Sequence, residues 1–111
     1  MGHPTSLGDF EQIVLLAILR LGDDAYGVSI RAEIAVRTGR EVAPGALYTA
    51  LDRLEEKKFV KSRMGDPTPQ RGGRSKRYYL VTAIGQQALV QTQDAYRRLL
   101  DGLELFGGAN A

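Results

Sequence analysis

Hydrophobic side chains recur every three or four positions through the first half of the chain, which is the spacing of one face of a helix. The pattern predicts helices over about residues 7–21, 26–38 and 44–57. Gly39 suits the left-handed residue that ends the second helix, and Pro44 suits the first turn of the third. The third helix has a narrow apolar stripe, made of Leu47, Ala50, Leu51 and Leu54. Two short helices joined by a tight link, the second with a narrow buried stripe, indicate a helix-turn-helix.

The next segment mixes apolar and polar residues at roughly every second position, which indicates β-structure. We expect strands over about residues 59–64 and 75–81, the second of them rich in strand formers. Two prolines in the intervening loop prevent regular pairing there, because proline has no N–H to donate. The strands therefore form an antiparallel hairpin with a long loop, in which Tyr78 and Tyr79 point to opposite faces.

A last helical pattern begins at Thr82, a good N-cap, and runs to about Phe106 before two glycines. A helix of this length spans roughly 35 Å, more than so small a core needs. Side chains three and four apart give it the spacing of a coiled-coil seam. They are Leu89, Thr92, Tyr96, Leu99, Leu103 and Phe106. We therefore expect a dimerisation helix over residues 82–106, followed by a disordered tail at 107–111.

The order of these elements is that of a winged helix-turn-helix. We expect a mainly α-helical fold with a small β-hairpin, in which residues 1–6 are a flexible N-terminus. A winged helix-turn-helix domain then covers residues 7–81, and the long C-terminal helix follows it. A chain of 111 residues has the length of one domain.

Composition excludes several classes of function. The chain has no cysteine and its single histidine is His3, so thiolate metal sites are ruled out and histidine-based catalysis is disfavoured. No nucleophile-elbow, P-loop or metal-ligand spacing occurs either. We expect a protein that is not an enzyme and has no metal or cofactor. The sequence shows no membrane-spanning run and no signal peptide, so we expect a cytoplasmic protein.

Charge is distributed unevenly along the chain. Residues 57–77 hold eight basic residues against Asp66 alone, a local charge of +7. The net charge is +2, so the remaining residues carry −5. A basic patch on an acidic body is typical of nucleic-acid binders, although a solvated basic loop would have the same composition.

Four strings resemble the PadR family of bacterial transcription regulators: LGDFEQIVLLAI, DAYGVSI, PGALYTALDRLE and GGRSKRYYLVTAIGQQAL. They occur in the family's order, from about residue 7 to 89. The resemblance implies a homodimer that binds a roughly palindromic operator on double-stranded DNA and usually represses transcription. A single C-terminal helix resembles the short branch of the family, some members of which bind planar hydrophobic compounds at the dimer interface. A small hydrophobic effector is therefore a further expected partner.

On the third helix, Gly45 and Ala46 would allow close approach to the major groove. Thr49 and Arg53 would contact bases or backbone there, and the alternative for Arg53 is a solvent ion pair with a neighbouring carboxylate. Tyr48 and Tyr26 are candidates for phosphate contact and equally for simple packing. Basic side chains of the hairpin would neutralise phosphates; they are Lys61, Arg63, Arg71, Arg74, Lys76 and Arg77. The predicted dimer interface comprises Leu7, Phe10, Leu89, Tyr96, Leu99, Leu103 and Phe106.

Two positions depart from the family's pattern. Ala43 stands where serine is frequent, so the third helix lacks an N-cap oxygen. Lys58 stands where glycine is frequent, at a helix end that favours the left-handed backbone. Both affect helix boundaries and leave the proposed DNA-reading face unchanged.

Two other functions fit the same architecture. A winged-helix protein-interaction module would bind duplex DNA weakly and would carry an apolar patch on the third helix. An RNA-binding module would use the basic hairpin, but single-strand readers typically have an exposed aromatic stacking platform. The hairpin lacks one, because at most one of its two tyrosines is free.

Overall fold

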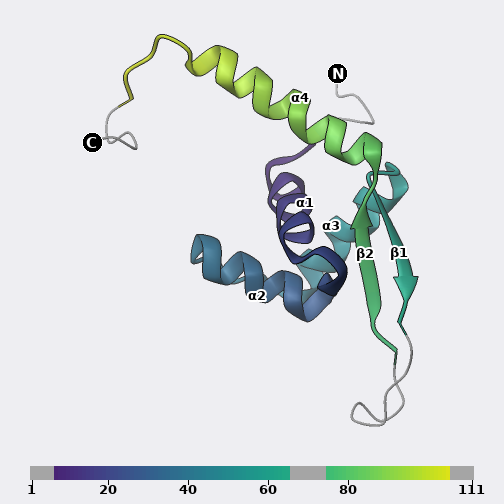
Figure 1. Cartoon of the computed structure of the whole chain (residues 1–111). Helices are drawn as coiled ribbons and strands as arrows, with labels where there is room; N and C mark the ends of the chain where they lie inside the picture. The colour runs from purple at the N-terminus through teal and green to yellow at the C-terminus, as the bar shows by residue number, and fades with distance from the viewer. Residues whose placement is uncertain (1–6, 66–74, 106–111) are drawn as a thin grey trace.

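The computed structural model describes residues 7–65 and 75–105 of the chain, which form four α-helices and one hairpin (Figure 1). The elements are α1 (Asp9–Leu21), the short 3-10 helix η1 (Gly22–Asp24), α2 (Gly27–Thr38), α3 (Pro44–Glu56), β1 (Val60–Met64), β2 (Arg77–Val81) and α4 (Ala83–Leu100). The fold is mainly helical with a two-stranded antiparallel hairpin, as the sequence predicts. We call the hairpin of β1 and β2 the wing.

The helix ends follow local chemistry. Gly39 has a left-handed φ of 73° and ends α2, which confirms its predicted role. The Thr82 hydroxyl accepts a hydrogen bond from the Gly85 N–H at 3.1 Å and caps α4. Ala43 stands at the start of α3 and offers no side-chain cap, as expected. Lys58 has a φ of 68°, so this lysine does occupy the left-handed region.

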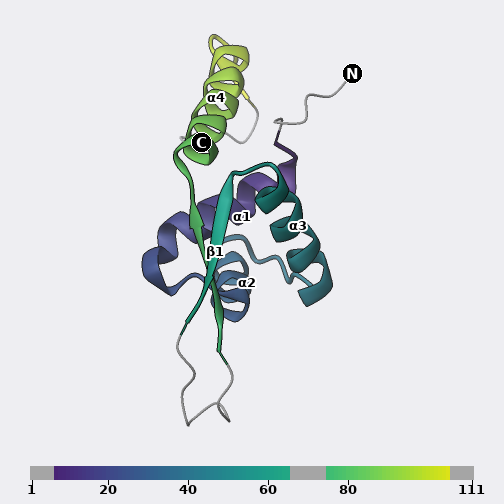
Figure 2. The same ribbon diagram turned by 90° about the vertical axis from the view of Figure 1, so that its right-hand side faces the viewer.

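The core lies where α1 meets α2, α3 and the wing. Val14 and Leu15 of α1 are fully buried, as are the inward residues of α2 and α3. The buried stripe of α3 is the predicted one, Leu47, Ala50, Leu51 and Leu54. This packing turns the opposite face of α3 outward, beside the wing (Figure 2).

The wing is joined to the helices along the free edge of β2. Its two strands pair antiparallel in a register that runs from Val60 opposite Val81 to Met64 opposite Arg77. The Tyr79 N–H also donates to the Ala25 carbonyl at 2.8 Å, on the chain between η1 and α2. Tyr79 is buried in the core, whereas Tyr78 lies on the other face, as the alternation predicts.

The predicted end of the last helix is wrong, because α4 ends at Leu100 and not near Phe106. Gly102 has a φ of 82°, and the Leu103 N–H donates to the Leu100 carbonyl at 2.9 Å, closing a turn. Glycine reaches this left-handed backbone without steric cost, so the helix stops at the first glycine of the segment and not at the pair that follows. Phe106 lies outside the described residues.

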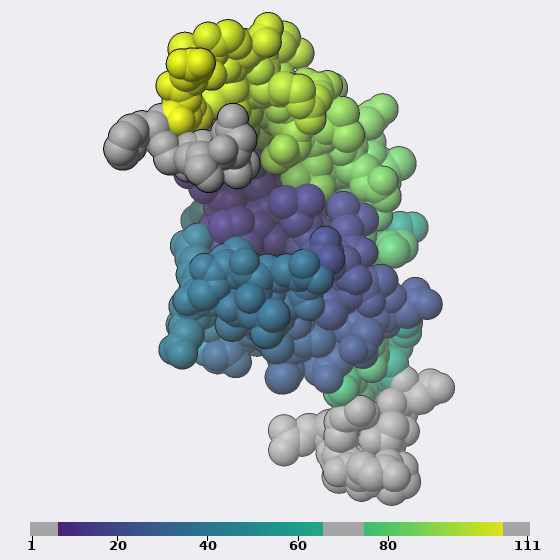
Figure 3. Space-filling view, turned by 60° about the vertical axis from the view of Figure 1, so that its left-hand side comes forward, coloured from purple at the N-terminus to yellow at the C-terminus, as the bar shows by residue number. Residues whose placement is uncertain are grey.

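Only the beginning of α4 packs on the body of the protein, beside α1. Leu89 is 5% exposed and belongs to the core, so its prediction as a seam residue at a dimer interface is wrong. Beyond Leu89 most residues of α4 are exposed, and Figure 3 shows the end of this helix at the top of the molecule, above α1. None of the helices within the described residues is long and apolar enough to cross a membrane.

Candidate nucleic-acid interface

The outward face of α3 carries small side chains at its first turn and polar ones beyond it. Its exposed residues include Gly45, Ala46, Thr49 and Arg53, and the same helix also exposes Asp52 and Glu56. Glycine and alanine at the start of a helix allow a close approach to another surface, and the first-turn N–H groups point outward there. The face therefore has the shape and polarity that a major groove accepts.

Arg53 is available on this face. Within the described part of the chain its guanidinium forms no salt bridge with Asp52 or Glu56. The structure therefore does not show the local ion pair that was the alternative role for Arg53. Lys57, one turn further, contacts the two carboxylate oxygens of Glu11 at 2.8 and 3.0 Å. Glu11 is mostly buried at the start of α1, so this ion pair ties α1 to the end of α3.

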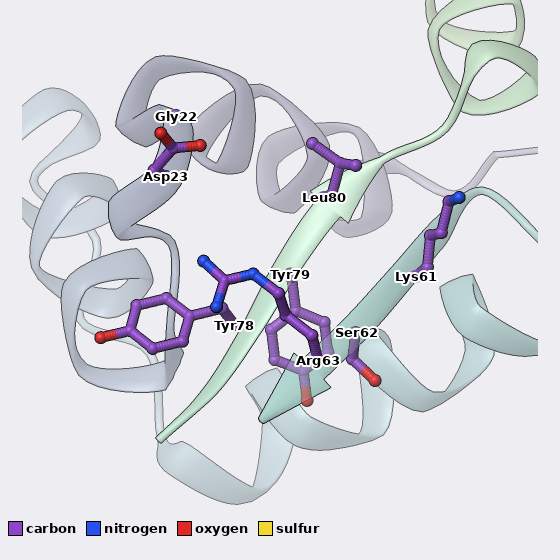
Figure 4. A pocket seen from close by; sticks show the side chains of 8 residues that line it. All are labelled: Gly22, Asp23, Lys61, Ser62, Arg63, Tyr78, Tyr79 and Leu80. Carbon is purple, nitrogen blue, oxygen red and sulfur yellow. The ribbon is translucent and has the colours of Figure 1, made fainter. Parts of the chain in front are cut away.

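The basic residues of the wing divide between its two faces. Lys61 and Arg63 of β1 lie on the outer face with Tyr78 and Leu80, and these residues line a small hollow together with Asp23 of η1 (Figure 4). Arg77 belongs to the other face: its guanidinium donates to the Ser62 hydroxyl at 2.9 Å.

That serine in turn donates to the Glu55 carboxylate of α3 at 2.8 Å. The side chains of Arg77, Ser62 and Glu55 therefore form a continuous polar chain between the wing and α3. No pattern in the sequence indicates this link, because its three residues belong to three different elements.

Two tyrosine rings and two cations gather at the base of the wing. Tyr26, which precedes α2, meets Tyr78 of β2 edge to face, with ring centroids 5.5 Å apart and ring planes at 62°. The Lys76 ammonium lies 3.6 Å from the centre of the Tyr26 ring. The Arg63 guanidinium lies 4.8 Å from the centre of the Tyr78 ring. Tyr78 was not among the predicted site residues, and its contact with Tyr26 has no local sequence signature.

Tyr48 is half exposed on α3, at the edge of the same region. A Cβ added at Gly27 would collide with the Tyr48 hydroxyl, so this ring lies directly on the backbone at the start of α2. Tyr48 and Tyr26 then line one groove together with Lys76 and Arg77. The groove separates the outward face of α3 from the base of the wing.

The buried tyrosine of the wing has a perturbed acidity. Burial raises the pKa of the Tyr79 phenol, and the nearby Arg77 guanidinium partly offsets that effect. The phenol therefore stays protonated over the physiological range and acts as part of the core.

The other predicted site residues lie on or just beyond α4, near the start of α1, or outside the described residues. Tyr96 and Leu99 are 49% and 76% exposed on the protruding part of α4, and Leu103 is exposed just beyond its end. Leu7 and Phe10 are half-buried and pack against the core of their own chain. Arg71, Arg74 and Phe106 lie outside the described residues.

Residues 15–91 match the family model of the transcriptional regulator PadR-like family. The chain belongs to this family. No protein with a curated function matches the sequence significantly. A PadR family transcription regulator from Clostridium difficile is 28% identical with a TM-score of 0.65, over 81% of this chain and 90% of that one.

Two further structures show the same architecture as this PadR-like chain. A transcriptional regulator from Clostridium thermocellum is 26% identical with a TM-score of 0.68, over 81% of this chain and 84% of that one. A winged-helix DNA-binding protein from STIV is 18% identical with a TM-score of 0.64, over 84% and 92% of the two chains. The last shows the fold alone. Together with the family match they show a winged-helix fold in a family of transcriptional regulators.

Proposed function

We propose that this PadR-like protein is a homodimeric repressor in the cytoplasm that binds a palindromic operator through α3 and the wing. The observation that carries the proposal is the outward face of α3, polar and accessible, with basic side chains of the wing beside it. A helix in the major groove reads base edges, while cations on the phosphates hold it in register.

The proposed DNA contacts differ between α3 and the wing. Gly45 and Ala46 let the first turn of α3 approach the bases, and Thr49 and Arg53 contact base edges or backbone. Phosphate contacts come from the exposed or half-exposed cations of the wing. Those within the described residues are Lys61, Arg63, Lys76 and Arg77. Arg71 and Arg74 are proposed for the same role from the sequence alone.

Dimerisation is proposed on the protruding part of α4. Tyr96, Leu99 and Leu100 are large apolar side chains that the body of the same chain does not cover. A second copy would remove them from water and would place two α3 helices on one duplex. The Tyr96 ring is the aromatic surface that a small hydrophobic effector between the subunits would contact.

The competing functions have little support in the geometry. A protein-docking surface on α3 would expose several large apolar side chains, whereas Tyr48 is the one such residue exposed on this helix. A single-strand reader would need a free aromatic ring on the wing. Tyr79 is buried, and Tyr78 lies between Tyr26 and Arg63.

Hydroxyl-radical footprinting on the DNA upstream of the protein's own gene tests the proposal. We expect two protected half-sites about one helical turn, roughly 10 base pairs, apart. Sedimentation analysis should show a dimer that Leu99→Glu converts to monomers. Val36→Glu, at an exposed position of α2, is the matched control and should leave the dimer intact. A dimer without a footprint would contradict DNA recognition, and a monomer protecting one half-site would contradict the homodimer.

A further inference from the structure

The contacts at the base of the wing form a continuous path from α3 to β2. The Tyr48 ring of α3 lies on the backbone of Gly27. The neighbouring Tyr26 contacts Tyr78 of β2 through its ring, and the same two residues form an isolated β-bridge through their backbones. We call Tyr26, Tyr48 and Tyr78 the tyrosine brace.

The brace also holds two cations of the wing. Lys76 and Arg63 lie over the Tyr26 and Tyr78 rings at 3.6 and 4.8 Å. Both distances are within the range at which a cation is attracted to an aromatic face. The brace therefore restricts where these long side chains point in the protein without DNA.

Close packing fixes the hairpin against the brace as well. A Cβ added at Gly65, where the chain leaves β1, would lie 2.6 Å from the Tyr78 ring. The Gly65 N–H donates to the Lys76 carbonyl at 2.7 Å, which extends the pairing of the strands by one step. The Tyr78 ring thus packs closely on the backbone at the point where β1 ends.

We propose that the tyrosine brace is a positioning device that sets the separation between α3 and the wing before DNA binds. The groove it borders, lined also by Lys76 and Arg77, then receives one DNA strand while α3 occupies the adjacent major groove. The rings act by position, because an already ordered wing loses less conformational freedom on binding. The inference rests on the proposed DNA-binding function and assigns Tyr26 and Tyr78 a role apart from direct phosphate contact.

The test is fluorescence anisotropy of a labelled mixed-sequence duplex across a salt series, since wing contacts contribute to binding of any sequence. Tyr26→Leu and Tyr78→Leu remove the rings, whereas Tyr26→Phe and Tyr78→Phe keep them and remove only the hydroxyls. The leucine variants should weaken binding about fivefold with an unchanged salt slope. The phenylalanine variants should bind like the parent protein. Lys76→Gln should instead reduce the salt slope by about one.

Circular dichroism identifies a leucine variant that has unfolded, and Gly27→Ala then supplies the second test. The added methyl displaces the Tyr48 ring while every ring remains present, and it should also weaken binding without changing the salt slope. If the folded leucine variants and Gly27→Ala bind DNA as tightly as the parent protein, the positioning role of the brace is wrong, while the proposed DNA-binding function stands. Equal losses in the phenylalanine and leucine variants would overturn positioning in favour of hydroxyl contacts. A parent protein that binds no duplex would overturn both this inference and the proposed function.

Discussion

Lys58 adopts a φ of 68° immediately after α3, in a backbone region that side chains with a Cβ disfavour. The chain is held there from both sides. The Lys58 N–H donates to the Glu55 carbonyl at 3.0 Å, and the Lys58 carbonyl accepts from the Thr82 hydroxyl at 2.7 Å. This residue therefore stores backbone strain that glycine would relieve without disturbing either hydrogen bond.

The size of the effect follows from two opposing terms. A non-glycine residue in the left-handed region costs about 1–2 kcal/mol. Glycine avoids that cost but loses more chain entropy on folding, by about 0.5–1 kcal/mol. We expect Lys58→Gly to increase the free energy of unfolding by about 0.5–1 kcal/mol and to raise Tm by about 3–6 °C.

Thermal unfolding followed by circular dichroism measures this change, at one fixed protein concentration because association also raises Tm. Lys58→Ala is the matched control: it removes the same charge and side chain but keeps the Cβ that causes the strain. Lys58→Gly should be more stable than Lys58→Ala. Equal stability of the two variants would refute the assignment of strain to this backbone.

Two further predictions concern the core. Gly85→Ala places a methyl group against the Phe59 carbonyl, a backbone atom that cannot easily move, and should lower the free energy of unfolding by about 1–3 kcal/mol in urea titrations; wild-type stability would contradict this packing. The pKa of Tyr79 is raised by burial, so the unfolded chain ionises first as pH increases. Stability from this group is present below about pH 10 and is lost above it. Urea midpoints measured across pH should therefore decrease less above this pH for Tyr79→Phe than for the parent protein. The same pH profile for both proteins would contradict the assignment.

Local patterns were sufficient to predict much of the fold. The alternation of the second strand correctly separated buried Tyr79 from Tyr78, and the spacing of α3 identified both its buried stripe and its outward face. The conformations of Gly39 and Lys58 also follow from single residues at helix ends. These features depend on short stretches of chain, in which period and backbone preference decide the outcome.

Other features depend on residues far apart in the sequence. Leu89 fits a coiled-coil seam by its spacing, but it is buried because the start of α4 lies on the body of the protein. The contact of Tyr26 with Tyr78 and the link from Arg77 through Ser62 to Glu55 have no periodic signature. Much of the candidate site could be named from residue type and charge, whereas the way its parts are held together required the structure.

The central claim is that α3 recognises a specific DNA sequence. Fluorescence anisotropy with DNA from upstream of the protein's own gene, beside a scrambled duplex and across a salt series, tests it most directly. We expect tight binding to the upstream DNA alone, weakened by salt and by Arg53→Ala. Arg97→Ala removes an equal charge from an exposed position of α4 and should bind like the parent protein. Equal affinity for both duplexes, or an Arg53→Ala protein that discriminates as well as the parent, would contradict sequence recognition by this face of α3.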